Sequence, residues 1–227
     1  MKRLHIIKIL SILKKAYGAP PRRRRSDPID EVVRTILSQN TNDINSLRAF
    51  AVLKQSFESW EELLDTNIAK LARLIKHAGL ANIKAKRIKE ALLEIKRREG
   101  RLSLGSLKNM DTGDAISYLR SIKGVGPKTA ACVLLFSLEK PVMPVDTHIY
   151  RVTGRLGLIS KDLSIEDAHR LLSDVVPKNL IYDFHLGIIE HGRKTCKAKN
   201  PKCGVCLLYS LCRFKEKTLY FRGKNDS

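Results

Sequence analysis

The 227-residue chain lacks any apolar stretch long enough to cross a membrane. A spanning helix needs about 18 or more consecutive apolar residues, and polar or charged side chains interrupt every apolar run well before that length. The sequence therefore argues against a membrane-spanning helix, and we expect no membrane partner.

Segments that alternate between polar and apolar residues are also missing, which argues against β-structure. Apolar residues recur instead at helical spacing, behind residues that favour helix starts. Helices are expected over residues 28–37, 81–99, 112–121 and 127–138. Expected cap residues are Asp27, Asn67, Asp146, Ser164 and Asn179. The pattern predicts an all-α protein.

The chain also lacks a convincing secretion signal. Lys2 and Arg3 precede apolar residues, but Lys8 interrupts them, and Lys14 and Lys15 stand where small cleavage-site residues would be. The spacing of four apolar residues predicts instead an amphipathic helix that packs on the body of the protein: Leu4, Ile7, Leu10 and Leu13. We therefore expect a cytoplasmic protein associated with the nucleoid.

Acidic residues are scarce, since 23 Asp and Glu face 43 Lys and Arg for a net charge of +20. A polyanion offsets the resulting repulsion, and nucleic acid is the usual polyanion. Three blocks, residues 1–27, 70–101 and 191–227, each carry +8, whereas residues 102–190 are neutral. The pattern suggests basic segments that grip phosphates around a neutral one, and Arg22–Arg25 suggests an exposed basic loop. A solvated basic surface is the alternative.

Four of the five cysteines lie within a short C-terminal stretch: Cys196, Cys203, Cys206 and Cys212. Without a secretion signal, this clustering argues for metal binding over disulfides. Zinc sites usually pair two C-x2–4-C units, and one pair here has that spacing. A single compact loop better suits a [4Fe–4S] cluster, with zinc or unliganded thiols as alternatives. The fifth, Cys132, is expected to be a small buried apolar residue.

Two glycines, Gly124 and Gly126, separate the helices expected over 112–121 and 127–138. They permit a tight turn and close approach to a ligand. Backbone N–H groups beside a helix start form an anion site suited to a phosphate. The expected binding residues of this hairpin are Lys123, Gly124, Val125, Gly126 and Thr129. An ordinary helix–turn–helix joint is the alternative.

Three motifs occur together: the hairpin with Lys128, the segment Val145-Asp146-Thr147-His148, and the C-x6-C-x2-C-x5-C tail. In this order they resemble the endonuclease III family of helix–hairpin–helix DNA glycosylases. The resemblance covers most of the chain and implies an all-α fold of two domains, with DNA bound across the cleft between them. It implies a six-helix barrel over residues 28–140, and an iron–sulfur cluster domain made of residues 1–27 and 141–227.

The resemblance also implies catalytic roles for Lys128 and Asp146. A neutral lysine amine attacks the sugar carbon C1′ and forms a Schiff base, which acidifies the 2′ proton for β-elimination. A carboxylate stabilises the cationic sugar that develops as the base leaves. A plain phosphate contact for Lys128 and a helix cap for Asp146 are the alternatives.

Gln39 and Asn40 lie where the family fills the gap left by a flipped-out nucleotide. The order Ser38-Gln39-Asn40-Thr41 is closer to plant 5-methylcytosine glycosylases than to endonuclease III, so either side chain could insert. An Asn-rich capping turn is the alternative. His148 is expected to contact DNA or to be structural, and Ile122-Lys123 replaces the family's usual Leu-Pro.

The sequence thus predicts a bifunctional DNA glycosylase and AP lyase of base excision repair. Its expected partner is duplex DNA with damaged bases or abasic sites, bound by a monomer, and oxidised pyrimidines are the first substrates to expect. Alternatives are an AP lyase or a glycosylase for mismatched or methylated pyrimidines. A non-catalytic, cluster-containing DNA-binding protein is a further alternative, although binding alone does not need both Lys128 and Asp146.

Overall fold

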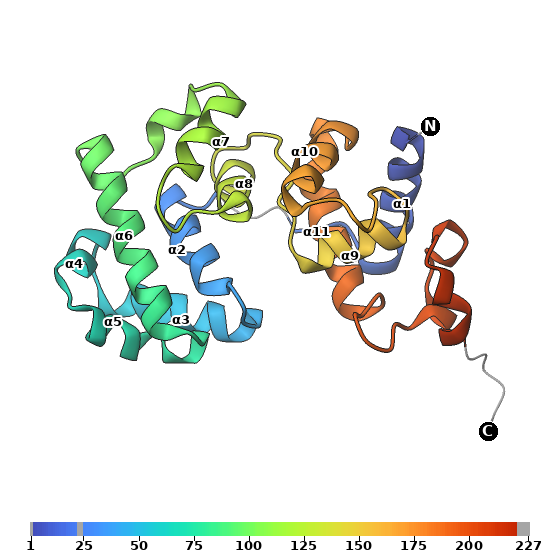
Figure 1. The fold of residues 1–227 in the computed structure, drawn as a ribbon, viewed down its shortest axis with the longest axis horizontal. Helices are drawn as coiled ribbons and strands as arrows, with labels where there is room; N and C mark the ends of the chain where they lie inside the picture. Colours follow the sequence, from blue (N-terminus) through green and yellow to red (C-terminus); the bar gives the residue numbers. More distant parts are fainter. Residues whose placement is uncertain (1, 22–24, 222–227) are drawn as a thin grey trace. The chain divides into compact units, whose positions relative to one another are not determined.

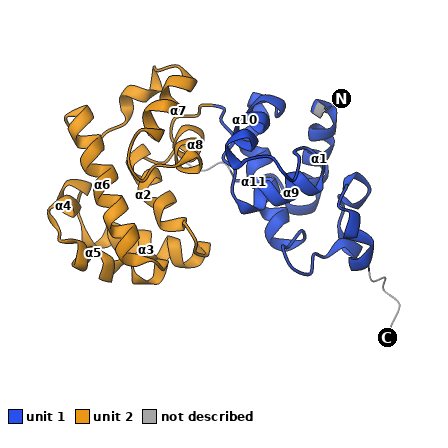
Figure 2. Ribbon diagram, in the orientation of Figure 1, with its two compact units in different colours: residues 1–23, 141–227 blue, residues 24–140 orange. Residues whose placement is uncertain are grey.

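The computed structural model describes residues 2–21 and 25–221, and within these ranges all regular structure is helical (Figure 1). The all-α prediction is confirmed. Two compact units are present, one made of residues 24–140 and the other of residues 1–23 with 141–227 (Figure 2). In the described ranges, no helix has both the length and the apolar content that crossing a membrane requires.

The continuous unit is built around α2 (Pro28–Ser38), which packs against α3 (Asp43–Ser56), α6 (Ala81–Glu99) and α8 (Pro127–Phe136). As predicted, Asp27 caps α2, and its Oδ1 accepts a hydrogen bond from the N–H of Ile29 at 2.8 Å. The other helices of this unit are α4 (Trp60–Asp65), α5 (Ile68–Leu74), η1 (Lys76–Ala78), η2 (Gly105–Lys108) and α7 (Thr112–Arg120).

This unit begins before residue 28, where the sequence suggests the boundary. Ser26 Oγ lies 3.1 Å from Glu31 Oε2 on α2 and 3.1 Å from Ser137 Oγ after α8. Arg25 pairs with Glu139 at the same place. Arg22–Arg24 of the expected basic loop lie outside the described residues.

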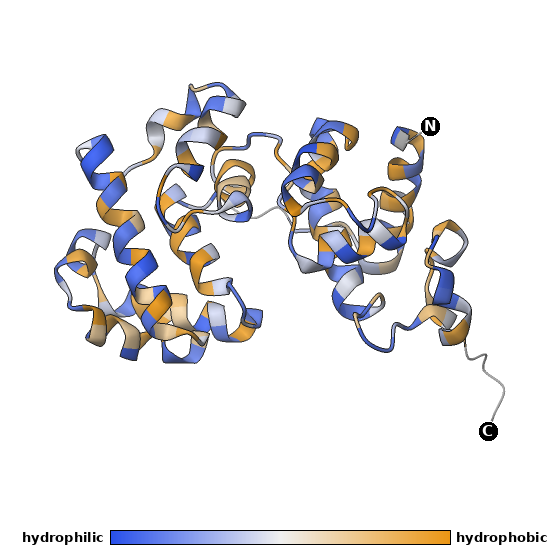
Figure 3. Ribbon diagram, viewed as in Figure 1, coloured by the Kyte–Doolittle hydropathy of each residue, from blue (hydrophilic) through white to orange (hydrophobic). Residues whose placement is uncertain are grey.

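The discontinuous unit combines α1 (Lys2–Tyr17) with three later helices: α9 (Thr147–Arg155), α10 (Ile165–Val175) and α11 (Ile181–Lys194). Both α1 and α9 pack against α11. Short 3-10 helices complete the unit: η3 (Lys178–Leu180), η4 (Cys203–Val205), η5 (Tyr209–Leu211) and η6 (Lys215–Tyr220). Figure 3 shows hydrophobic and hydrophilic residues interleaved along these helices, as amphipathic packing requires.

The N-terminal helix forms as predicted, but the predicted buried face is wrong in part. Leu4 is 75% exposed and Ile7 is 47% exposed. The side chains that are buried are Ile6, Ile9, Leu10 and Leu13. Both sets fit the helical period, and the observed one has the i, i+3, i+4, i+7 pattern of a stripe wide enough to cover a neighbouring helix.

The predicted caps of the later helices hold with one exception. Asp146 caps α9 and Ser164 caps α10. Asn179 does not cap α11, because residues 178–180 form a separate 3-10 turn and α11 starts at Ile181 without a side-chain cap. The apolar Cys132 is buried on α8, as expected.

Candidate functional site

The turn between α7 and α8 closes tightly. The N–H of Val125 donates to the carbonyl of Ile122 at 3.0 Å, and Gly124 has a φ of 91°, which glycine adopts without strain. A Cβ at Gly124 would lie 3.4 Å from the carbonyl oxygen of Arg87 on α6. Conformation and space therefore both favour glycine at this position.

No side chain caps the first turn of α8, which follows Gly126. The first N–H groups of a helix lack partners within the helix, so this open start can receive an anion. The other predicted hairpin residues differ in accessibility. Val125 and Thr129 have buried side chains and can offer only backbone atoms, while the exposed Lys123 pairs with Glu90 at 3.0 Å.

Lys128 stands in the first turn of α8, half-buried. Its Nζ donates to Ser38 Oγ at the end of α2, over 3.4 Å. Ser38 Oγ in turn donates to the carbonyl of Thr35 at 2.9 Å. The amine is therefore held by one long, weak hydrogen bond, which leaves it free to move toward another group.

The turn between α2 and α3 treats its two amide side chains differently. Gln39 is half-buried, and its Oε1 accepts a hydrogen bond from Arg87 Nη1 at 2.7 Å. Asn40 is exposed and has a φ of 51°, a conformation that asparagine tolerates better than most residues. Asn42 caps α3 through its Oδ1, 2.9 Å from the N–H of Asn45. Both the predicted turn and its capping role are present.

Lys84 is buried next to this turn and holds its backbone by hydrogen bonds, a role that the sequence did not reveal. Its side chain is 1% exposed, and its Nζ donates to the carbonyls of Leu37 at 2.7 Å and Ala78 at 2.6 Å. Burial lowers the pKa of Lys84 to about 8. In the sequence it is one of many basic residues in the block 70–101, with nothing to mark it as buried.

Leu80 is a second residue whose conformation and exposure the sequence did not reveal. It precedes α6, is 51% exposed and has a φ of 49°. A left-handed backbone is unfavourable for a leucine, and exposing an apolar side chain gains nothing in water. Strain and exposure at one residue point to a functional use. The only signal in the sequence is the preceding Gly79, which ends the previous helical segment.

Asp146 lies in the other unit, at the start of α9. Its Oδ1 accepts a hydrogen bond from the N–H of Ile149 at 2.7 Å, so the helix-cap interpretation is correct. One carboxylate oxygen suffices for this cap, and the half-buried side chain retains a second oxygen.

The segment that leads to Asp146 is held by side chains from α10 and α11. The N–H of Met143 donates to Ser173 Oγ at 2.9 Å, and the carbonyl of Met143 lies 2.9 Å from His169 Nδ1. The next carbonyl, that of Pro144, lies 3.1 Å from His185 Nδ1. Three consecutive backbone groups are thus fixed just before the carboxylate.

The far end of α9 holds the C-terminal loop. Arg151 Nε donates to the carbonyl of Cys196 at 3.0 Å, and its Nη2 donates to the carbonyl of Gly192 at 3.0 Å. Arg155 Nη1 lies 3.3 Å from Cys196 Sγ. The helix α9 therefore has Asp146 as its cap at one end, and at its other end Arg155 contacts the first cysteine of the loop.

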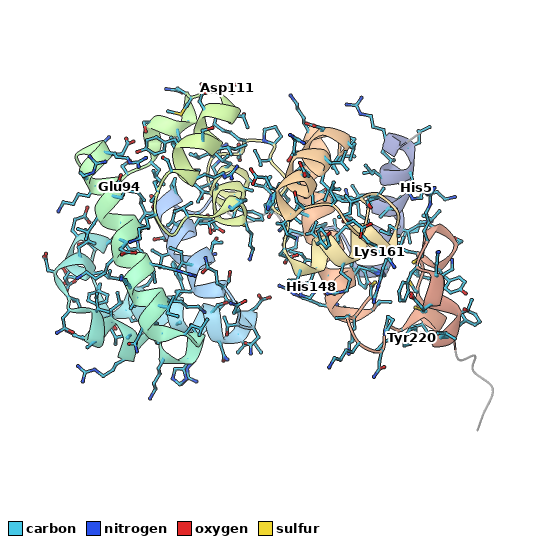
Figure 4. The ribbon with its side chains drawn as sticks, in the orientation of Figure 1. His5, Glu94, Asp111, His148, Lys161 and Tyr220 are labelled. Carbon is cyan, nitrogen blue, oxygen red and sulfur yellow. The ribbon has the colours of Figure 1, made fainter. Side chains whose placement is uncertain are left out.

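His148 lies on α9 (Figure 4) and packs against α11. A Cβ at Gly192 would lie 2.9 Å from its Nδ1, which also accepts a hydrogen bond from Arg151 Nη2 at 3.2 Å. Burial lowers the pKa of His148. These contacts give the histidine a structural role in this unit and favour that interpretation over DNA contact.

The four clustered cysteines line a single pocket with Arg155 and Lys217. None of the four forms a disulfide. Within residues 2–21 and 25–221, no three His, Cys, Asp or Glu side chains converge closely enough to hold one metal ion. A [4Fe–4S] cluster takes one thiolate on each of four separate irons, and nearby cations offset its negative charge. The donor set therefore fits such a cluster.

Comparison with known proteins agrees with both features. Residues 33–178 match the HhH-GPD superfamily of base excision DNA repair proteins, and residues 196–212 match the iron–sulfur binding domain of endonuclease III. Endonuclease III of Thermotoga maritima is 32% identical over 208 residues, which cover 91% of each chain. A candidate DNA glycosylase of Arabidopsis thaliana is 36% identical over 181 residues, 78% of this chain and 62% of the longer plant protein.

Among solved structures, a trapped covalent intermediate of endonuclease III with DNA has a TM-score of 0.82 and 26% identity, and covers 96% of this chain and 99% of that one. The chain therefore belongs to the HhH-GPD superfamily of base excision DNA repair proteins. Within that superfamily it is an endonuclease III-like DNA glycosylase with an iron–sulfur cluster domain.

Proposed function

We propose that this glycosylase is bifunctional: it removes a damaged base through a Schiff base on Lys128 and then cleaves the strand by β-elimination. The observation that carries the proposal is Lys128 itself, a loosely held amine in the first turn of α8. The uncapped helix start beside it suits a DNA phosphate, which would place the sugar of a bound nucleotide near the amine.

The chemistry assigns a separate task to each catalytic group. As the bond from the base to C1′ breaks, Asp146 stabilises the positive charge on the sugar. The neutral amine of Lys128 adds to C1′. The bond from C1′ to the ring oxygen then breaks, the oxygen takes a proton from the amine and remains as the 4′ hydroxyl, and C1′ becomes a protonated imine. Loss of a 2′ proton then expels the 3′ phosphate, and water finally releases the lysine. The trapped covalent complex reported for an endonuclease III supports this route.

We further propose that Cys196, Cys203, Cys206 and Cys212 ligate the [4Fe–4S] cluster, which holds the C-terminal loop in place. The residues proposed to contact DNA are Lys123, Gly124, Gly126 and the backbone at Val125 and Thr129. Asn40 fills the gap left by the flipped nucleotide, because Gln39 is already held by Arg87. Leu80 is an apolar wedge against the stacked bases.

Oxidised pyrimidines in duplex DNA are the proposed substrates, processed by a monomer in the cytoplasm in association with the nucleoid. The net charge of +20 supports DNA as the partner, and the likeness to endonuclease III relatives supports a damaged base as the target. Abasic sites are the proposed second substrate, since the same imine forms once the base is gone.

Borohydride trapping tests the nucleophile. The wild-type chain is expected to form a covalent adduct with an abasic duplex, and Lys128→Gln is expected to form none while still binding the duplex. Lys123→Gln is the matched control, because it removes a neighbouring lysine of the same hairpin that is exposed and paired with Glu90. Trapping that persists in Lys128→Gln would refute the assignment.

A panel of duplexes, each with one defined lesion, tests the substrate in the same preparation. Base release from an oxidised pyrimidine at a rate above that from mismatched or methylated pyrimidines supports the proposal. Cleavage restricted to abasic sites would make the protein an AP lyase. Binding without any turnover would make it a non-catalytic DNA-binding protein.

A further inference from the structure

His191 lies on α11 directly behind the cysteine pocket, and its side chain is 3% exposed. Both ring nitrogens have partners. Nε2 lies 3.7 Å from Cys206 Sγ, and Nδ1 lies 2.9 Å from the hydroxyl of Tyr17. The imidazole therefore bridges one cysteine of the loop and the last residue of the N-terminal helix α1.

Tyr17 has a second partner, because its hydroxyl lies 2.8 Å from Thr195 Oγ1. Its ring packs on that of His191 at a tilt of 52°, with the ring centres 6.0 Å apart. The four groups Thr195, Tyr17, His191 and Cys206 thus form a continuous chain of contacts. It ends on a sulfur atom and joins residues far apart in the sequence.

A bound cluster determines which group donates and which accepts in each of these hydrogen bonds. A ligating cysteine is a thiolate without a proton, so the hydrogen in the contact between Nε2 and Cys206 must come from the imidazole. A neutral imidazole carries one N–H, so Nδ1 then accepts, and the hydroxyl of Tyr17 donates to it. The hydroxyl of Thr195 donates to the oxygen of Tyr17. Every group in the chain is satisfied in this one arrangement.

We propose that Tyr17 and His191 form a hydrogen-bond relay that holds an N–H on the Cys206 sulfur and raises the reduction potential of the cluster. The relay rests on the four-cysteine ligand set proposed above. Hydrogen bonds to the sulfurs set the potential of an iron–sulfur cluster, since a donor stabilises the electron-rich reduced state more than the oxidised state. The relay is a positioning device and takes no part in base removal.

Two of the other sulfurs of the pocket have donors of a different kind, and Cys206 itself also receives a backbone N–H from Leu208. Arg155 Nη1 lies 3.3 Å from Cys196 Sγ, and the N–H of Phe214 lies 3.5 Å from Cys212 Sγ. A guanidinium carries its protons permanently, and a backbone amide cannot exchange donor for acceptor. The imidazole at Cys206 has two tautomers, and the hydroxyl of Tyr17, by donating to Nδ1, stabilises the one that donates to the thiolate.

Redox titration of the purified full-length protein tests the relay. His191→Leu removes the donor and is expected to shift the midpoint potential of the cluster to a more negative value. Tyr17→Phe is expected to shift it in the same direction by a smaller amount, because the imidazole can then adopt the other tautomer. His191→Gln, which restores an N–H near the sulfur, is expected to recover part of the shift.

Tyr182→Phe is the matched control, because it removes a hydroxyl of the same unit that donates to the carbonyl of Pro21. Resonance Raman spectra give a second readout: bands of the iron–cysteine bonds are expected at higher frequency in both relay variants and unchanged in the control. If His191→Leu fails to keep the cluster, Tyr17→Phe decides the question.

The relay alone would be overturned if Tyr17→Phe had the same potential and Raman bands as wild type. The same result in a His191→Leu variant that keeps its cluster would also overturn it. A wild-type protein without iron would overturn the ligand assignment, and the relay with it. Trapping of abasic DNA by Lys128 is measured separately, so failure of the lyase proposal is distinguishable from either result.

Discussion

At the scale of single residues, the chain places a buried cation beneath the turn between α2 and α3. Lys84 is enclosed, and its Nζ donates to two backbone carbonyls. A neutral amine still has two N–H donors, so both bonds survive deprotonation. The residue can therefore give up its charge without releasing the backbone that it holds.

This property predicts a pH dependence of stability. The pKa of Lys84 is about 8 in the folded protein against an ordinary value of 10.5. Between these values the unfolded state binds more protons, so the contribution of Lys84 to the unfolding free energy rises with pH. The gain is about 3 kcal/mol across the window. Urea unfolding below, within and above it should show the difference between wild type and Lys84→Met widening in favour of wild type.

Lys86→Met supplies the control for that measurement, since it removes an exposed lysine from the same helix. Parallel stability curves for wild type and Lys84→Met would contradict the prediction. They would mean that the buried amine keeps its proton throughout the range.

At the scale of elements, the turn between α2 and α3 is fixed at its ends and free at its tip. Lys84 holds the carbonyl of Leu37, Arg87 holds Gln39, and Asn42 caps α3. Asn40 alone among these turn residues combines exposure with a left-handed backbone. A side chain held out on a rigid turn loses little entropy when it inserts into DNA.

Asn40→Gly tests this turn, because glycine removes the side chain without straining the backbone. The rate of base release from a damaged duplex should fall about tenfold, the loss expected when roughly 1.4 kcal/mol of hydrogen bonding to the gap is removed. Cleavage of a preformed abasic site should fall less. Gln39→Ala, measured in the same single-turnover assay, should have the smaller effect on base release. If Gln39→Ala lost more base release than Asn40→Gly, Gln39 would be the residue that fills the gap left by the flipped nucleotide.

The elements also show how much the sequence could reveal. Helix starts at Asp27, Asn67, Asp146 and Ser164 were predictable because a capping side chain acts on its own next turn. The spacing of the cysteines identified the cluster loop for the same local reason. The buried face of α1 was only partly predictable, because two apolar stripes fit the helical period and packing against α11 chooses between them.

Long-range contacts explain the remaining failures. Nothing local distinguishes Lys84 from its exposed neighbours, because its partners lie on other elements. The same holds for His191, whose partners come from α1 and from the cysteine loop. The burial of the Val125 and Thr129 side chains was likewise not readable from the sequence, and it leaves their backbone groups for the predicted contact with DNA.

At the scale of the whole molecule, the net charge of +20 predicts a strong dependence of DNA binding on salt. Each phosphate neutralised by a lysine or arginine releases counterions. Contact with about six phosphates would weaken binding roughly a thousandfold between 50 and 200 mM salt. Fluorescence anisotropy with an undamaged duplex measures the slope. A flat response would show that the charge is merely solvated.

One unit is a continuous segment of the chain, whereas the other joins two segments that are far apart in the sequence. This difference affects the order in which the units form during synthesis. Residues 24–140 are contiguous, so this unit can close as soon as α8 leaves the ribosome. The apolar stripe of α1 instead packs against α11, which is synthesised more than 160 residues later. At about 5–20 residues per second, a ribosome keeps that stripe uncovered for roughly ten seconds or more. A nascent chain of this protein should therefore need shielding at its first helix until the last one emerges.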